Sequence, residues 1–168
     1  ALLINHLHFL SAVDSSGAAY VAGYAYGSDF PFTTGAFHTS DVGPSAFALK
    51  LSPDFSSLVY SARLGGSLSF NYGQWGTEPQ AIAVNAAGEA FVGGFTQSNA
   101  FPTTSNSYRT TMVGGTDGFL TRISADGSHL LYSTYFGNSR MLSGYAYPFL
   151  GVGAIAIFEL AVARLVVI

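Results

Sequence analysis

The 168-residue sequence contains no cysteine, and charged residues make up only 9% of it. The absence of cysteine excludes disulfide bonds, cysteine-ligated metal and thiol catalysis. The six basic residues are scattered and the formal net charge is −3, which argues against a nucleic-acid-binding surface. The chain has instead 49% hydrophobic residues and 20 glycines. This composition favours one folded domain with many short strands and tight turns.

An internal repeat dominates the sequence. A shift of 71 residues places Gly17 on Gly88 and Phe30-Pro31 on Phe101-Pro102. After a one-residue insertion the shift becomes 72, and Tyr60 falls on Tyr132. Because the register holds along both copies, the chain contains two copies of one structural unit.

Each copy has the hydrophobic pattern of four strands. The runs in the second copy are 81–84, 89–96, 117–124 and 129–136, and those in the first are 10–13, 18–25, 45–52 and 57–64. Turn sequences such as "DSSG" and "ADGS" separate the first run from the second and the third from the fourth. We therefore expect an all-β fold in which each copy forms a four-stranded antiparallel sheet. Repeated sheets of this kind stack around an axis in a β-propeller.

The sequence thus predicts a partial β-propeller with two four-stranded antiparallel blades, and the start of a third blade is one interpretation of its last residues. The predicted divisions are residues 1–9 as the end of a preceding blade or a leader, 10–67 as blade 1, 68–80 as a connection, 81–139 as blade 2, and 140–168 as a connection followed by a third blade or a hydrophobic tail.

The apolar segment 149–168 has three open interpretations: the first strands of a third blade, a membrane or interfacial helix, or a truncated or non-native end. Its length suits a bilayer span, but Glu159 and Arg164 are costly in a membrane. A third blade would place a turn glycine near position 161, where the chain has Ala161.

Several blocks occur in the same order in both copies. They are 12–24, 28–40 and 46–67, with 83–95 and 117–139 as their partners. These blocks resemble the bacterial SBBP (seven-bladed β-propeller) repeat family. The resemblance implies a propeller blade, often found in secreted or surface proteins, and no established chemistry. The chain departs from the family in having only two clear copies and in its connection 68–80, which is often shorter and more acidic in the family.

In a four-stranded meander the tight turns share one end of the sheet and the long connections share the other. The long connections, 25–45, 65–80, 97–116 and 137–153, are therefore the expected place for ligand recognition. The candidate ligand-binding residues are the repeated Phe30 and Phe101 and the unrepeated Tyr72 and Trp75. Each also has a structural interpretation, in which the aromatic ring packs its loop onto the sheet.

We predict no catalytic residue, no metal site and no cofactor. His6 and His8 alternate on an expected strand, but no third ligand is evident. Asp14, Asp54 and Asp126 stand in turns, where aspartate caps backbone amides, and the turns contain too few carboxylates for calcium. Nucleophile-elbow and phosphate-loop motifs do not occur.

The sequence is therefore interpreted as a non-enzymatic binding or scaffold module of a bacterial secreted or cell-surface propeller protein, with a protein or carbohydrate ligand. The alternative is a glycan-directed enzyme, or a fragment of one, with its site in the same loops and Glu78 as the acid beside Tyr72 and Trp75. The expected partners are other blades of the same propeller or further copies of the chain, because two blades leave sheet faces and edges uncovered. Nucleic acid is not expected, and a membrane only if 149–168 is a helix.

Overall fold

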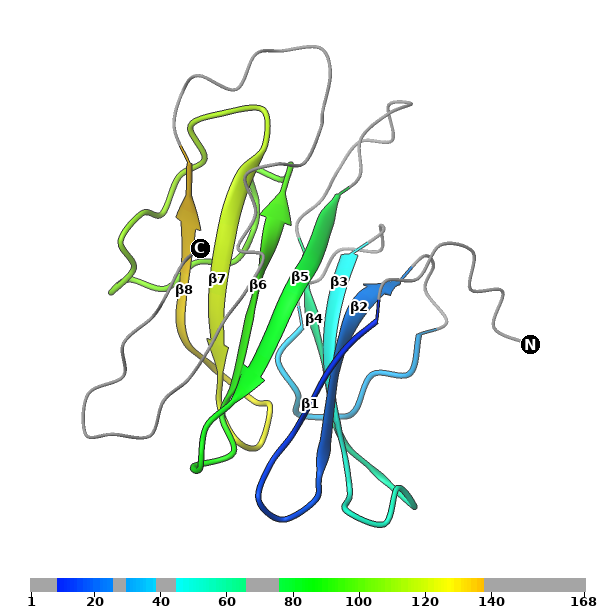
Figure 1. Cartoon of the computed structure of the whole chain (residues 1–168). Coiled ribbons are helices and arrows are strands. Elements are labelled where there is room, and N and C mark those ends of the chain that lie inside the picture. Colours follow the sequence, from blue (N-terminus) through cyan, green and yellow to red (C-terminus); the bar gives the residue numbers. More distant parts are fainter. Residues whose placement is uncertain (1–8, 26–29, 39–44, 66–75, 138–168) are drawn as a thin grey trace.

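The computed structural model of the chain describes residues 9–25, 30–38, 45–65 and 76–137. These residues form eight strands and no helix (Figure 1). The strands are β1 (Leu10–Val13), β2 (Ala19–Ala25), β3 (Ser45–Leu51), β4 (Leu58–Leu64), β5 (Thr77–Val84), β6 (Ala90–Thr96), β7 (Asp117–Ile123) and β8 (Leu130–Phe136). They make two four-stranded antiparallel sheets, ordered β1-β2-β3-β4 (sheet 1) and β5-β6-β7-β8 (sheet 2). The prediction of an all-β chain with two such sheets is confirmed.

The two sheets repeat each other down to their irregularities. Gly23 pairs with Phe47 in sheet 1, and their repeat mates Gly94 and Phe119 pair in sheet 2. The register of the β3–β4 pair shifts between Lys50 and Leu51, and that of the β7–β8 pair shifts at the equivalent place, between Arg122 and Ile123. The similarity seen in the sequence is therefore a similarity of hydrogen-bond register.

Strand β5 begins at Thr77, so residues 77–80 of the expected connection 68–80 belong to a strand. Proline argues against a strand in a sequence, because it donates no ladder hydrogen bond. Pro79, however, lies beside a register shift between Pro79 and Ala81, where the regular pairing of β5 with β6 is interrupted. A bulge of this kind is one of the places where a strand tolerates proline.

The tight turns also correspond between the two copies. Gly17 and Gly88 end the β1–β2 and β5–β6 turns with positive φ angles of 88° and 76°, which glycine adopts without steric cost. The β7–β8 turn has Gly127 at φ 75°, but the β3–β4 turn has Phe55 at the same place, with φ 57°. Phe55 thus holds a backbone conformation that L-residues with bulky side chains rarely adopt.

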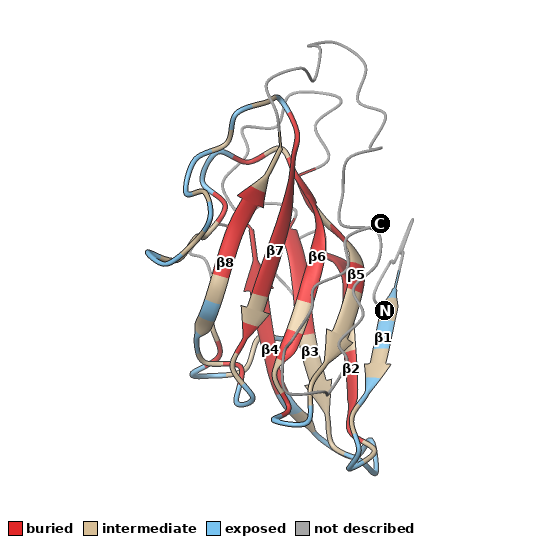
Figure 2. Ribbon diagram, turned by 60° about the vertical axis from the view of Figure 1, so that its left-hand side comes forward, coloured by how far each residue is buried: buried red, intermediate tan, exposed pale blue. Residues whose placement is uncertain are grey.

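The two sheets pack face to face over one shared core (Figure 2). Side chains alternate along a strand, so each sheet has two faces. The inner face of sheet 1 carries buried Tyr20, Ala22, Ala46, Ala48, Tyr60, Ala62 and Leu64, and the inner face of sheet 2 carries buried Ala90, Val92, Phe119, Ile123 and Tyr135. Complete burial of Val92 and Ile123 contributes about 1.5–3 kcal/mol each to the stability of this interface.

The sheet interface joins unlike faces. The repeat mates of Tyr20 and Tyr60 are Phe91 and Tyr132, which lie on the far face of sheet 2, away from sheet 1. Likewise Val21, the mate of Val92, lies on the far face of sheet 1. The interface is therefore heterologous, and each far face corresponds to a surface that the other sheet uses inside the molecule.

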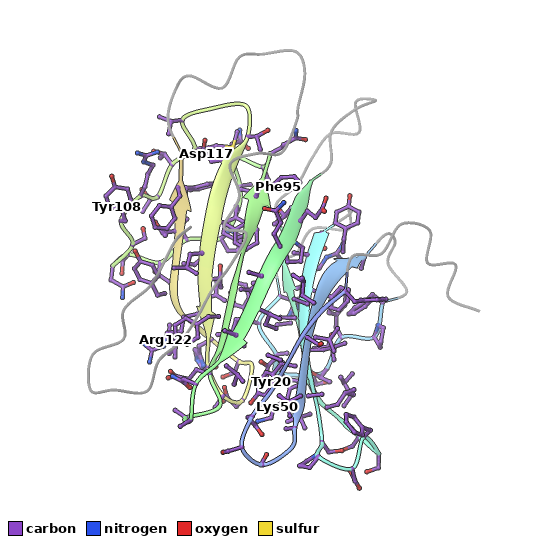
Figure 3. The ribbon with its side chains drawn as sticks, in the orientation of Figure 1. Tyr20, Lys50, Phe95, Tyr108, Asp117 and Arg122 are labelled. Atoms are coloured by element: carbon purple, nitrogen blue, oxygen red, sulfur yellow. The ribbon has the colours of Figure 1, made fainter. Side chains whose placement is uncertain are left out.

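A hydrogen-bonded cluster fixes the lower part of the interface (Figure 3). The Tyr20 hydroxyl lies 3.1 Å from the Gly88 carbonyl oxygen of sheet 2 and 3.0 Å from an Asp14 carboxylate oxygen, so its single proton is shared between two acceptors. Lys50 Nζ is 3.6 Å from the same carboxylate. Hydrogen bonds from Ser16 and Tyr20 to the carboxylate hold the Asp14 pKa at about 2, whereas burial raises the pKa of Tyr20.

Candidate functional site

The strand ends that the long connections join lie opposite the tight turns, as the connectivity requires (Figure 1). The best described of them is the loop between β6 and β7, residues 97–116. Its course shows why the Phe-Pro-Thr pattern occurs in both copies.

The phenylalanine of the pattern packs the loop onto its own sheet. The Phe101 ring lies 4.7 Å from that of Phe119 and 5.7 Å from that of Tyr135, measured between centroids, and is 4% exposed. The Phe30 ring lies 4.4 Å from that of Phe47 in the equivalent place on sheet 1. Phe30 is half-buried, because it lies on the far face of sheet 1, whereas Phe101 lies between the two sheets.

The threonine of the pattern covers the open edge of the last strand. Thr104 Oγ1 accepts a hydrogen bond of 3.0 Å from the Ser133 N–H in β8, and the Thr104 N–H donates one of 3.0 Å to the Ser133 carbonyl. In sheet 1, Thr33 Oγ1 accepts a 2.9 Å bond from the Ser61 N–H in β4. An unprotected edge strand pairs readily with other chains, so the repeated motif protects each sheet from such pairing.

A buried tyrosine fixes the start of the β6–β7 loop. The Tyr135 hydroxyl donates a 2.8 Å hydrogen bond to the Ser98 carbonyl and accepts a 3.0 Å bond from the Phe101 N–H. Burial raises the pKa of Tyr135 to about 12. Its phenol therefore stays neutral at physiological pH and acts as a structural anchor for the loop.

An exposed aromatic ring lies farther along the same loop. Tyr108 is 70% exposed and lies beside the edge of β8 (Figure 3). Its ring is stacked on that of Phe136, with centroids 5.8 Å apart and planes 16° from parallel, and its N–H donates a 3.0 Å bond to the Tyr132 hydroxyl. The Arg109 guanidinium lies 5.6 Å from the Tyr108 ring and donates a 2.7 Å bond to the Gly137 carbonyl. We call Tyr108, Arg109 and Phe136 the Tyr108 platform.

A buried carboxylate holds the end of this loop. Asp117 is completely buried, and its two oxygens accept hydrogen bonds of 2.9 Å and 3.1 Å from the Val113 and Gly114 N–H groups. Thr116 accepts a 3.2 Å bond from the Gln97 side chain at the other end of the loop. Both ends of the loop that carries Tyr108 are thus fixed, so the ring is presented on an ordered support.

The platform combines features that suit a planar or amphipathic ligand. A tyrosine ring offers an apolar face and a polar hydroxyl, and a guanidinium offers several hydrogen-bond donors. Among the described residues, no group of three or more histidine, aspartate and glutamate side chains is placed to hold a metal ion. The described part of the chain also has no helix long and apolar enough to cross a membrane.

Of the four residues predicted from the sequence to bind a ligand, the structure describes two, Phe30 and Phe101, and these two lie in different surroundings. Phe101 lies in the core between the sheets, and Phe30 lies in an aromatic cluster with Phe32 and Phe47 on the far face of sheet 1. Tyr72 and Trp75 lie outside the described residues, as do His6, His8 and the segment 149–168.

Tyr108 is the repeat mate of Phe37 and is not among the four residues predicted from the sequence. The two differ in the structure: Phe37 is packed against the shared core and its N–H donates a 2.7 Å bond to the Gly127 carbonyl of sheet 2, whereas Tyr108 is exposed. The signal in the sequence was the change from Phe-His at 37–38 to Tyr-Arg at 108–109, because amphipathic side chains tolerate water.

Comparison of the chain with protein-family models finds none that matches, and a search of curated proteins finds no match either. The functional interpretation therefore depends on the geometry of the chain itself.

Proposed function

We propose that the chain is a non-enzymatic binding and scaffold module of the β-propeller type, related to the SBBP repeats that its sequence resembles. In this proposal the stacked sheets are the scaffold, and the loops opposite the tight turns carry the ligand-binding surface. Its setting is a secreted or cell-surface protein of a bacterium, as the resemblance implies.

The scaffold part of the proposal is supported by the heterologous interface between the sheets. Equivalent units that pack through unlike faces can be extended in both directions, as in rings and linear arrays. The far face of sheet 1 carries the same residue positions that sheet 2 uses between the sheets, and the far face of sheet 2 carries the positions that sheet 1 uses there. A module of this construction serves to position loops rather than to enclose a substrate.

The binding part rests on one observation, the Tyr108 platform. Its ring is 70% exposed although it is stacked on Phe136 and its backbone is fixed by the Tyr132 hydroxyl. An exposed aromatic ring that is already ordered loses little conformational entropy when a ligand covers it. A sugar ring stacked on Tyr108, with its hydroxyls near the Arg109 guanidinium, fits these features.

The alternative function, a glycan-directed enzyme, requires a pair of acidic groups around a scissile bond. Asp117, the buried acid of the described loop, has both oxygens occupied by backbone N–H groups. Asp117 therefore supports the loop and is a poor partner for Glu78, the acid of the alternative, which lies in β5 opposite Phe95 of β6. This favours binding over hydrolysis.

A glycan-array screen of the full chain tests the proposal. We expect the wild type to retain a glycan and Tyr108→Ala to weaken binding by about tenfold, the equivalent of about 1.4 kcal/mol. Val113→Ala is the matched control, because Val113 is 48% exposed in the same loop but has no aromatic ring. Trp75→Ala tests the site predicted from the sequence. Retention of no glycan, or equal binding by wild type and Tyr108→Ala, would contradict the proposal.

A further inference from the structure

The far face of sheet 1 is largely apolar, and its polar residues include Ser61 and Arg63 of β4, which pair with Leu49 and Phe47. Its lower half carries Val13, Val21, Leu49, Leu51 and Val59, of which Val13 is 63% and Val59 47% exposed. Its upper half carries the aromatic cluster of Phe9, Phe30, Phe32 and Phe47, in which Phe9 is 53% exposed. We call the five aliphatic residues of the lower half the valine patch.

The repeat shows what such a surface contacts. The mates of Val21 and Leu51 in sheet 2 are Val92 and Ile123, and both are completely buried against the inner face of sheet 1. The mates of Phe30 and Phe47 are Phe101 and Phe119, which are buried in the same interface. The face of sheet 2 that is equivalent to the far face of sheet 1 is therefore covered by another sheet, namely sheet 1.

The interface between sheet 1 and sheet 2 also shows which residues a sheet must have in order to cover the far face of sheet 1. Tyr20 donates to the carbonyl of Gly88, and the equivalent acceptor on sheet 1 is the carbonyl of Gly17, in a turn of the same conformation. Tyr60 fills the space above Gly127 so closely that a Cβ built on Gly127 would lie 2.3 Å from Tyr60 Cγ. At the place of Gly127, sheet 1 has Phe55, whose side chain is 62% exposed.

A second copy of the chain does not meet these needs. The corresponding surface of a second copy is the far face of sheet 2, where Phe91 replaces Tyr20 and Tyr132 stands at the position of Tyr60. Phe95 and Leu120 on that face are buried. Phe91 has no hydroxyl for the Gly17 carbonyl. The ring of Tyr132 would occupy the space that Phe55 requires.

From these contacts we infer that the far face of sheet 1 binds a further four-stranded sheet of the same repeat type, distinct from a second copy of this chain. That sheet has a tyrosine at the position of Tyr20 and a small residue at the position of Tyr60, which admits Phe55. The inference rests on the scaffold part of the proposed function and is independent of ligand binding at Tyr108.

Internal duplication of residues 10–80 tests this inference, because the chain 1–80 followed by 10–168 supplies a further sheet of the same repeat type through the chain's own connection, residues 68–80. With Tyr60→Ala in the first copy only, we expect the thermal midpoint to rise by several degrees above that of the undoubled chain, in one cooperative transition. The matched duplication that keeps Tyr60 should show no rise. Val13→Asp in the second copy should cancel the gain, because Val84, the repeat mate of Val13, packs against the shared core. Equal midpoints for the two duplications would overturn the inference.

Sedimentation of the undoubled chain tests the exclusion of a second copy. We expect the wild type and Val13→Asp to have the same mass at every concentration. Association of the wild type that Val13→Asp abolishes would show that the patch accepts a second copy, and this would overturn the inference. Tyr108→Ala should leave both experiments unchanged, so failure of the glycan screen and failure of the docking surface are distinguishable.

Discussion

At the scale of single residues, the β3–β4 and β7–β8 turns are a natural pair for mutation. Phe55 and Gly127 occupy the same position with φ angles of 57° and 75°. Gly127→Ala adds left-handed strain of about 1–2 kcal/mol and a Cβ that collides with Tyr60, for which overpacking costs about 1–3 kcal/mol more. Phe55→Ala keeps the strain and removes an exposed ring, so its effect should stay within about 0.5 kcal/mol. Urea unfolding measures the loss of unfolding free energy in each variant. Equal losses in Gly127→Ala and Phe55→Ala would show that Tyr60 does not restrict position 127.

Asp14 gives the protein a defined pH dependence. Its pKa is lowered from 3.8 to about 2 in the folded state, chiefly by the hydrogen bond from Ser16. A carboxylate with a lowered folded-state pKa stabilises the fold above its unfolded pKa and loses this effect as the pH falls through the folded value. We therefore expect Asp14→Asn to be less stable than the wild type above about pH 4, and the difference to shrink between about pH 4 and pH 2.

Denaturant unfolding at a series of pH values measures this difference for Asp14. Asp54→Asn is the comparison, because Asp54 also has a pKa of about 2 but lies in an exposed turn bonded to Ser52 and Ser56. Only Asp14→Asn should in addition alter the Tyr20 contact with Gly88. A difference between Asp14→Asn and the wild type that stays constant down to pH 2 would contradict the assignment.

At the scale of elements, the loops protect the edges of the last strands. Thr104→Val keeps the shape of the side chain but removes the acceptor of the buried Ser133 N–H, so unfolding should be easier by about 1–3 kcal/mol. Hydrogen exchange at the Ser133 amide should also be faster in Thr104→Val than in the wild type. Thr103→Val is the matched control, since Thr103 is the repeat mate of Phe32 and an apolar side chain suits that position. Unchanged exchange at Ser133 in Thr104→Val would show that the loop does not protect this edge.

The strands could be predicted almost completely from the sequence, because alternation and turn residues act locally. The eight expected runs match the observed strands closely, and β5 is the one that starts well outside its run. The missed residues were 77–80, where Pro79 favours a loop reading and only the bulge, a property of two paired strands, permits a strand.

The candidate site was less predictable than the strands, because exposure depends on the neighbouring sheet. Phe30 and Phe101 have the same motif and the same packing partner in their own sheets. They differ in burial because the other sheet covers Phe101 and leaves Phe30 on a far face. Tyr108 and Phe37 also differ in burial, because Phe37 contacts sheet 2 and packs against the shared core, whereas Tyr108 is exposed. The local sequence determines which strand each ring packs on. Whether a ring is buried or exposed to solvent depends on how the two sheets stack.

At the scale of the whole molecule, the two sheets share one core, so we expect them to unfold together. Ala48→Leu tests this, because Ala48 is completely buried on the inner face of sheet 1. Its repeat mate is Leu120, so leucine suits the strand itself, and the cost of about 1–3 kcal/mol arises from overpacking against sheet 2. Hydrogen exchange should accelerate equally in β3 and β7, because global unfolding governs both. If Ala48→Leu accelerates exchange in β3 and leaves β7 protected, the sheets are separate folding units that merely touch, and the shared core does not couple them.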